Sequence, residues 1–332
     1  MPNRAAVIRS VGRYLPEHRL TNQDLEKMVD TTDDWILTRT GIRERRILDP
    51  GLATSHMAAS AGKECLERAG VDAGEIDMII VSTISADMTI PATACLVQRE
   101  LGATRAWGYD LGAACSGFVY SLTTAAAMIE SGRYEKILVI SADTMSTIVN
   151  YEDRNTCVLF GDGAAAALLE PSPEEGYGIL DCINHMDGAG SEWLKRQAGG
   201  SRVPLTEDVL RRKEHLVTQD GKRIFKVAVK EMAAVSLELL RRNGLTIEDL
   251  DVFIPHQANS RIIVACAQHM DLDPAKVVTN IETVGNTVNA TIPLALYQAV
   301  VEEGRLKRGD NLILTAFGAG LTWGGVYIKW YD

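Results

Sequence analysis

The sequence lacks the cysteine and histidine spacings of a metal site or a redox motif. Its six cysteines lie at positions 65, 95, 115, 157, 182 and 266, no two form a Cys-x-x-Cys pair, and the six histidines add no metal-ligand spacing. Thiols scattered in this way are typical of a reduced, cytoplasmic protein. We therefore expect a cytoplasmic location and no bound metal.

A long hydrophobic run and an excess of positive charge are also missing. No apolar stretch is long enough to span a bilayer, and the chain runs straight into a strand-like segment at 5–12 without a signal-peptide pattern. The formal net charge of -10 argues against a general nucleic-acid or membrane-surface binder. An acidic partner would therefore need a local basic patch.

What the sequence does have is enough apolar residues, 46% of 332, to bury a large core in two domains or one large α/β unit. Hydrophobic patterning predicts strands and helices in alternation. The expected strands are 5–12, 77–81, 106–110, 136–140, 251–254, 311–314 and 324–330, with two more on either side of a hairpin turn at 161–163. The expected helices are 55–70, 92–101, one from 115, 222–242, 259–270 and 291–303.

Three landmarks of the first half recur in the second at a nearly constant offset. They are a helix-ending glycine, the start of a strand and a residue within a strand, namely Gly70 and Gly244, Asp77 and Asp251, and Ile137 and Leu312. The offset is 174 residues for two pairs and 175 for the third. This regularity indicates a duplicated α/β unit, divided into 1–172 and 173–332. The alternative is the ordinary alternation of strands and helices in any α/β protein.

Cys115 stands between a strand-like run and a long apolar helix, and small residues flank it. The first turn of a helix offers unpaired N–H groups and a partial positive charge, which favour the thiolate and lower its pKa from about 8.5. Cys115 is therefore a candidate nucleophile. The alternative is a small buried hydrophobic residue, which is what most cysteines are.

Loops at the carboxyl ends of strands carry the binding sites of α/β proteins, and two related halves can bring their loops together. In the second half these loops carry His256 and Asn286. Each could be structural, as a hydrogen-bonded histidine or a turn asparagine. With Cys115 they suit thioester chemistry, because a nucleophile is joined by two neutral groups that can hydrogen-bond a carbonyl. Backbone N–H groups of the glycine loop 318–320 could add to this site.

The same glycine loop superficially resembles a phosphate-binding loop. A strand rather than a helix follows it in the pattern, so we do not expect a dinucleotide site there.

Six motifs in order along residues 5–330 carry a family resemblance. They are Trp35-Ile36 with Arg39-Thr40-Gly41-Ile42, Ala114-Cys115-Ser116-Gly117-Phe118, Asp153-Arg154 before Phe160-Gly161-Asp162-Gly163, His256-Gln257-Ala258-Asn259, Gly285-Asn286-Thr287, and Thr322-Trp323-Gly324. With these motifs the chain resembles β-ketoacyl-acyl-carrier-protein synthase III, the condensing enzyme that starts bacterial type II fatty-acid synthesis. The resemblance implies the thiolase fold, an α/β fold whose two pseudo-duplicated halves form five layers, α-β-α-β-α.

The resemblance also implies a mechanism. Cys115 would take an acyl group from a short acyl-CoA, while backbone N–H groups of Cys115 and Ala319 hold the oxyanion. Malonyl-acyl-carrier protein would then lose CO₂, with His256 and Asn286 hydrogen-bonding its thioester oxygen, and the carbanion would attack the acyl-Cys115. The enzyme would be an acyltransferase without metal or cofactor and a homodimer.

Binding residues follow from the same resemblance. CoA would contact Thr31, Trp35, Arg39, Arg154, Gly221 and Asn259, with Trp35 and Arg154 on either side of the adenine and Arg39 near the phosphates. The acidic carrier protein would contact Gln257, Arg261 and Lys226, with Lys222, Arg223 and Lys230 nearby. Ile90 and Phe317 would line the acyl pocket. Trp35 could otherwise be a packing residue, and Arg154 an ion-pair partner.

Two departures from the family pattern concern the acyl pocket. Val288 and Asn289 stand where small residues are usual, which predicts a different pocket wall. Ile90 stands where some relatives carry a phenylalanine that reaches across the dimer, which predicts tolerance of longer or branched primers.

Other functions remain open at this point. The nearest is a secondary-metabolism relative that transfers an acyl group to another acceptor. A hydrolytic Cys-His-Asn enzyme and a non-catalytic carrier-protein binding module are more distant. A thiolase would need a second cysteine in the C-terminal glycine loop, and positions 316–325 contain none.

Overall fold

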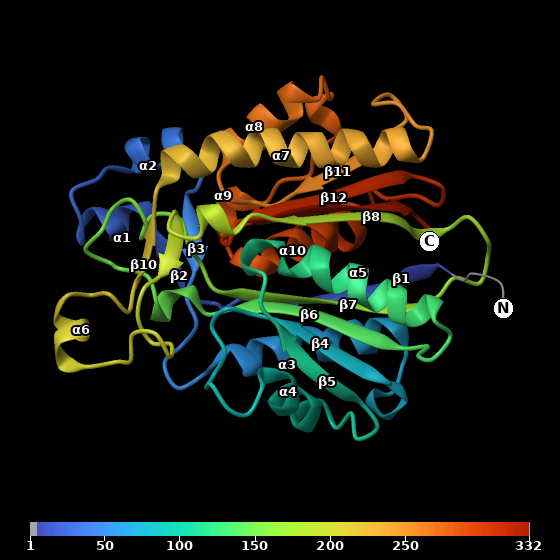
Figure 1. The fold of residues 1–332 in the computed structure, drawn as a ribbon, viewed down its shortest axis with the longest axis horizontal. Coiled ribbons are helices and arrows are strands. Elements are labelled where there is room, and N and C mark those ends of the chain that lie inside the picture. Colours follow the sequence, from blue (N-terminus) through green and yellow to red (C-terminus); the bar gives the residue numbers. More distant parts are fainter. Residues whose placement is uncertain (1–4, 332) are drawn as a thin grey trace.

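The computed structural model describes residues 5–331, which form two mixed sheets of related topology (Figure 1). The first sheet has the order β1-β7-β6-β4-β5, with bounds Ala6–Tyr14, Gly163–Pro171, Ile137–Asp143, Met78–Ser82 and Trp107–Leu111. The second has the order β8-β13-β12-β11, with bounds Gly178–Met186, Thr322–Lys329, Asn311–Gly318 and Val252–Pro255.

The two sheets repeat one arrangement of parallel and antiparallel pairs. In each sheet two antiparallel pairings join three strands at one edge, β1-β7-β6 and β8-β13-β12. Each then continues with a parallel partner, β4 beside β6 and β11 beside β12. Only the first sheet completes a fifth strand, β5. Its counterpart in the second half is reduced to a single parallel bridge between Phe253 and Val277.

Helices complete five layers. Helices α3 (Thr54–Ala69) and α4 (Thr93–Leu101) cover the outer face of the first sheet, and α7 (Gly221–Arg242) and α8 (Ser260–His269) cover the second. Between the sheets lie α5 (Gly117–Glu130) and α10 (Thr291–Tyr297) (Figure 1). The predicted thiolase-like fold of two duplicated halves is confirmed. The first sheet ends at Pro171 and the second begins at Gly178, and we retain the division at residue 172 as a proposal.

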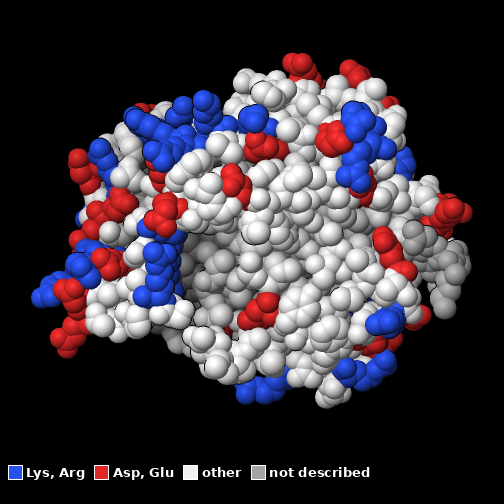
Figure 2. All heavy atoms as spheres, in the orientation of Figure 1, with Lys and Arg blue, Asp and Glu red and all other residues white. Residues whose placement is uncertain are grey.

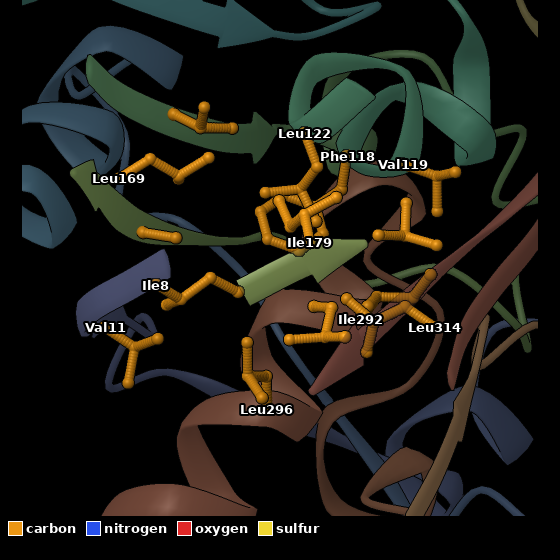
Figure 3. Close-up of a cluster of buried hydrophobic side chains, with 14 of the residues drawn as sticks. Ile8, Val11, Phe118, Val119, Leu122, Leu169, Ile179, Ile292, Leu296 and Leu314 are labelled. Atoms are coloured by element: carbon orange, nitrogen blue, oxygen red, sulfur yellow. The ribbon is translucent and has the colours of Figure 1, made fainter. Parts of the chain in front are cut away.

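The middle layer contains the largest buried cluster, part of which Figure 3 shows. Phe118 and Leu122 of α5 and Ile292 and Leu296 of α10 belong to this cluster, and all four side chains are fully buried. A helix buried between two sheets needs an apolar surface on every side, which explains why the sequence after Cys115 is apolar without a polar stripe. The buried strand β4 is apolar on both faces for the same reason.

Two predicted elements differ from the structure. The helix expected at 291–303 is α10 followed by a π-helical turn at Gln298–Glu302. The hairpin turn expected at 161–163 is wrong, because β7 begins at Gly163 and a turn region precedes it. Asp162 is buried at that point, and its carboxylate accepts hydrogen bonds from the N–H of Leu48 and from the N–H and hydroxyl of Ser146.

Smaller elements lie around the end of the sheets where the strands β4 and β11 finish. They include α1 (Asn22–Glu26), α2 (Asp33–Thr40), the paired strands β2 (Arg19–Thr21) and β3 (Glu44–Arg46), and α9 (Ile281–Val284). A segment between β8 and α7 adds β9 (Leu194–Arg196), α6 (Glu207–Arg211) and β10 (Val217–Gln219). Within residues 5–331 no helix has both the length and the apolar character needed to cross a membrane.

Candidate active site

The loop that carries Cys115 is held against the end of the second sheet. Cys115 lies in the short helix η2 (Ala114–Ser116), directly before α5. The Ser116 hydroxyl donates to the carbonyl of Thr322 at 3.0 Å, and the Thr322 hydroxyl donates to the carbonyl of Ala113 at 3.0 Å. A Cβ on Gly318 would lie 2.7 Å from the Cys115 nitrogen, so this approach requires glycine. The sulfur of the first half is thus fixed to the glycine loop of the second.

Cys115, His256 and Asn286 line one cavity of about 130 Å³. Phe317 and Gly318 also line it, and Gly221 and Asn259 belong to the same lining. The three polar groups come from three separate loops, after β5, after β11 and after α9. The structure therefore brings together the three residues that the sequence selected, from both halves of the chain.

His256 follows β11 on a rigid support. Its backbone N–H donates to the Thr315 carbonyl at 2.8 Å, and its ring Nδ1 lies 2.7 Å from the Thr291 hydroxyl oxygen. Burial lowers the pKa of the imidazole to about 3. His256 is therefore neutral at physiological pH and can hydrogen-bond a substrate without adding a charge.

The side-chain amide of Asn286 has one fixed orientation. Its Oδ1 accepts a hydrogen bond from the Val288 N–H at 2.9 Å, which leaves its two Nδ2 hydrogens without a partner in residues 5–331. Its backbone is pinned as well, by hydrogen bonds to Leu159 and Gly161. The left-handed positions of this loop are Gly285 and Val288, so a turn requirement does not account for the asparagine.

The pKa of the Cys115 thiol is raised, whereas the sequence predicts that it is lowered. Burial, and after it the nearby Asp143 carboxylate, raise the pKa of the thiol to about 12, although the residue's own backbone N–H acts in the opposite direction. The expected lowering by the helix N-terminus is therefore outweighed by burial. Without substrate the group is a thiol at neutral pH, so its proton must leave as the sulfur attacks.

A second cavity, of about 220 Å³, also reaches Cys115 and shares Phe160 and Leu194 with the first. Its wall is mainly apolar and comes from several elements, with Ile84, Met145, Ile148, Val217 and Val288 among its lining residues. Apart from Val288, which departs from the family pattern, the sequence gives no sign of these residues. No periodic pattern joins them, because they lie on unconnected loops and on β10.

The two residues predicted to line the acyl pocket, Phe317 and Ile90, lie in different surroundings. Phe317 lines the first cavity and not the second. Ile90 lines neither cavity, and 83% of its surface is exposed on the segment between β4 and α4. Within one chain, then, Ile90 does not shape the space around Cys115. A role across a dimer remains a prediction.

Asn289, the second departure, also lines neither cavity. It is 1% exposed, and its Nδ2 donates to the buried carboxylate of Asp143 at 2.6 Å. Its Oδ1 accepts from the Ser82 hydroxyl at 2.7 Å. Asn289 therefore connects the ends of β4 and β6 to the loop that carries Asn286.

Residues expected to bind CoA lie around Trp35 of α2. The guanidinium carbon of Arg39 lies 4.6 Å from the centre of the Trp35 ring, and that of Arg154 lies 5.3 Å from it. The Thr31 hydroxyl is buried and has no partner among the residues described. Asn259 donates to the Arg39 carbonyl at 2.9 Å, so it connects this group to the first cavity.

A basic surface lies over the start of α7 and the start of α8. Figure 2 shows Lys and Arg side chains gathered in this region. Its exposed members are Lys222, Arg223, Lys226, Lys230 and Arg261. We refer to these five residues as the α7–α8 basic surface.

Gln257 does not belong to this surface. It is 0% exposed, and its side-chain amide donates to the carbonyls of Pro255 and Val278. The expected contact with a carrier protein is therefore corrected. Gln257 belongs to the loop that follows β11. Its buried side chain supports this loop from the inside.

Comparisons with known proteins agree with this geometry. The family model for 3-oxoacyl-[acyl-carrier-protein (ACP)] synthase III matches residues 109–188, and the model for its C-terminal part matches residues 240–330. The chain is 52% identical over 327 residues to the β-ketoacyl-[acyl-carrier-protein] synthase III of Chlorobaculum tepidum, which covers 98% of this chain and 99% of that protein.

Solved structures give the same result. The 3-oxoacyl-[acyl-carrier-protein] synthase III from Aquifex aeolicus has a TM-score of 0.90 and 42% identity, and the match covers 98% of this chain and 100% of that one. The priming β-ketosynthase of the R1128 polyketide biosynthetic pathway has a TM-score of 0.91 and 35% identity, with 100% and 98% covered.

Two duplicated halves with a cysteine on one and a neutral histidine and asparagine on the other define a condensing enzyme of the thiolase fold. Within that class, the chain belongs to the β-ketoacyl-acyl-carrier-protein synthase III family.

Proposed function

We propose that this protein condenses a short acyl-CoA primer with malonyl-acyl-carrier protein and releases CoA, CO₂ and 3-oxoacyl-acyl-carrier protein. The observation that carries the proposal is the single cavity shared by Cys115, a neutral His256 and an Asn286 amide whose hydrogens are free. This set provides a nucleophile and two uncharged donors, which are the groups needed for acyl transfer and for enolate stabilisation.

In the first half-reaction the acyl group moves from CoA to Cys115. The adenine binds between Trp35 and Arg154, with Arg39 near the phosphates, and the pantetheine arm passes Gly221 and Asn259 toward the sulfur. The Cys115 sulfur bonds to the acyl carbon, the bond from that carbon to the CoA sulfur breaks, and the thiol proton leaves with CoA. The N–H groups of Cys115 and Ala319 bind the oxyanion.

In the second half-reaction the malonyl carboxylate leaves as CO₂. The electron pair of the broken C–C bond spreads onto the thioester oxygen, where His256 and Asn286 donate hydrogen bonds. The α-carbon then attacks the acyl carbonyl, the bond to the Cys115 sulfur breaks, and the released thiolate takes up a proton from water to regenerate the thiol. Neutral donors suit this step because burial keeps His256 unprotonated, and an acidic imidazolium would quench the carbanion.

The proposal is tested with acetyl-CoA or isobutyryl-CoA and malonyl-acyl-carrier protein. It predicts CoA, CO₂ and 3-oxoacyl-carrier protein in equal amounts. Formation of free carboxylic acid without the 3-oxo product would instead indicate a hydrolase. Binding without any turnover would indicate a carrier-protein binding module.

A secondary-metabolism relative is the second candidate, favoured by the similarity to the priming β-ketosynthase described above. That enzyme class would use a different acceptor or malonyl donor. The same assay with the carrier proteins of fatty-acid and polyketide synthesis distinguishes the two, because the preferred carrier protein shows a higher kcat/KM.

The second cavity is the proposed acyl pocket, and its wall sets the primer preference. Val217 is 6% exposed in that wall, and its N–H donates to the Ile148 carbonyl. Val217→Phe should fill part of the cavity and lower kcat/KM for isobutyryl-CoA about tenfold more than for acetyl-CoA. The measurement is a primer panel, with the exposed Val264→Phe as the control. An equal loss for both primers would contradict the assignment.

The α7–α8 basic surface is the proposed docking site for the acidic carrier protein. Its members lie near the entrance to the first cavity, which Gly221 and Asn259 line. Arg261→Glu should raise KM for malonyl-carrier protein about tenfold or more, with an effect that shrinks at high salt, and should leave acyl transfer from CoA unchanged. Lys63→Glu on the outer helix α3 is the matched control. A salt-independent loss of both half-reactions would rule out docking.

We also propose a cytoplasmic homodimer without metal or cofactor. The strand β5 is an edge strand of the first sheet, and its Trp107 is 44% exposed. Met88 and Ile90, which are also exposed, lie on the segment that leads into α4. An open edge with exposed apolar side chains favours pairing with a second copy. Light scattering would measure the mass of the particle in solution, which should be twice that of one chain for a homodimer.

A further inference from the structure

The carboxylate of Asp143 holds two segments that are distant in the sequence. Asp143 ends β6 and is 0% exposed. Its Oδ1 accepts hydrogen bonds from the Ile84 N–H at 2.8 Å and from the hydroxyls of Ser85 at 2.9 Å and Thr83 at 3.1 Å. Its Oδ2 accepts from the side-chain amide of Asn289 at 2.6 Å and from its backbone N–H at 3.3 Å. One oxygen therefore holds the loop after β4, and the other holds the turn before α10.

Each of these two segments contributes a residue to the wall of the second cavity. Ile84 lines that cavity, and so does Val288, which directly precedes Asn289. Val288 has φ +53°, which a β-branched residue rarely adopts, so the surrounding contacts must hold its turn in place. Asp143 itself lines neither cavity. It therefore acts on the wall through the residues that it holds.

The amide partner of Asp143 also packs against the helix that follows Cys115. The Oδ1 of Asn289 accepts a hydrogen bond from the Ser82 hydroxyl at 2.7 Å. A Cβ on Gly117 would lie 1.9 Å from this Oδ1 and 1.8 Å from the Ser82 Oγ, so the close approach requires glycine. Residues of β4, β6 and α5 thus fix the position of Asn289.

A buried carboxylate is a costly way to join these segments. Burial raises the pKa of Asp143, and the hydrogen bonds from Ile84, Asn289 and Ser85 act in the opposite direction. Its five hydrogen bonds come from neutral groups, so no cation offsets the cost of burying the charge. What the carboxylate provides is direction, because hydrogen bonds on both oxygens fix the two segments in one arrangement.

We propose that Asp143 is a positioning residue that fixes the wall of the second cavity and so determines which acyl primer fits beside Cys115. It holds Ile84 directly and Val288 through Asn289. This role rests on the proposed function, because the second cavity is taken as the acyl pocket. Asn289 is one of the two departures from the family pattern, and it acts on the wall without lining the cavity.

Exchanging the two side chains tests the pair without changing its size. Asp143→Asn sets two amide donors against each other when the new amide keeps its oxygen toward Ile84, and Asn289→Asp sets two carboxylates against each other. The double variant Asp143→Asn/Asn289→Asp again joins one amide to one carboxylate. Asp77→Asn is the matched control, because Asp77 also accepts two backbone N–H hydrogen bonds but lies at the opposite end of β4 and β6.

The first measurement is the second-order rate constant for acylation of Cys115 by acetyl-CoA and by isobutyryl-CoA. Each single variant should lower the constant for isobutyryl-CoA about five- to tenfold more than that for acetyl-CoA, because the larger acyl group makes more contacts with the displaced wall. The double variant should return the ratio to within about twofold of wild type. Asp77→Asn should leave it unchanged. A wild-type ratio in both single variants, or a ratio that the double variant does not restore, would overturn the proposal.

Thr83→Val covers the case in which Asp143→Asn does not fold. It removes one hydroxyl from the same carboxylate oxygen with little change in shape. The ratio of the two acylation rate constants should shift in the same direction, by about twofold. A folded Thr83→Val variant with the wild-type ratio would count against the role of Asp143.

Hydrogen exchange provides a second measurement that does not depend on the reaction. The N–H groups of Ile84 and Asn289 should exchange slowly in the wild type, since both donate to a buried carboxylate. Asp143→Asn should speed exchange in the peptides that contain them about tenfold or more, and the double variant should restore slow exchange at Ile84. Unchanged exchange in Asp143→Asn would overturn the proposal. Failure of every primer to acylate wild-type Cys115 would overturn the proposed function, while the exchange would still decide whether Asp143 holds the two segments.

Discussion

Cys115→Ala is expected to abolish the acyl-enzyme and to lower condensation by on the order of 10⁴-fold or more, because the variant lacks the thiol that carries the acyl chain. Cys115 is the one cysteine among the residues that line either cavity. Intact-mass spectrometry after incubation with acetyl-CoA should show one acetyl group on the wild-type chain and none on the variant.

The matched control is Cys157→Ala, since Cys157 is also buried but lines neither cavity. It should keep the single acetyl adduct and the activity. An acetyl adduct that persists in Cys115→Ala, or disappears in Cys157→Ala, would place the nucleophile elsewhere.

Asn286→Ala is expected to lower CO₂ release from malonyl-carrier protein about 10²- to 10³-fold, the usual cost of losing one oxyanion donor. Acetylation of Cys115 should stay within a few-fold of wild type. The reason is geometric: Val288 holds the Asn286 oxygen, so the variant loses a preoriented N–H donor, while the N–H groups beside Cys115 remain. Separate assays of CO₂ release and of acetyl-CoA consumption measure the two effects.

Asn286→Asp sharpens this test. The substitution keeps the shape but replaces the N–H donor by a carboxylate, whose negative charge would oppose the enolate. CO₂ release should therefore fall at least as far as in Asn286→Ala. Decarboxylation that survives in Asn286→Asp would show that the side chain does not contact the developing charge.

Much of the fold and the main cavity could be predicted because both depend on local patterns. Buried strands are apolar throughout, and each is followed by a loop, so the offset of 174 residues located related loops in the two halves. His256 directly follows a strand of the second sheet, and Cys115 lies in the short loop after β5 of the first. Their meeting in one cavity is a consequence of that topology.

The remaining features depend on side-chain contacts between distant segments, which no local pattern records. Burial raises the pKa of Cys115, and burial depends on the whole fold. The sequence shows only the helix start, which would lower that pKa. Gln257 directly follows His256, yet its side chain turns inward. The wall of the second cavity is assembled from unconnected segments such as β10 and the loop at Met145.

We propose that acyl transfer and decarboxylation are separate steps, carried by the two halves of the chain around one cavity. The most direct test follows the acetyl group on Cys115 in the double variant His256→Ala/Asn286→Ala after malonyl-carrier protein is added. We predict that one acetyl group per chain forms on Cys115 and remains there, with no CO₂ released. A double variant that fails to acetylate Cys115, or that releases CO₂ at the wild-type rate, would contradict the account.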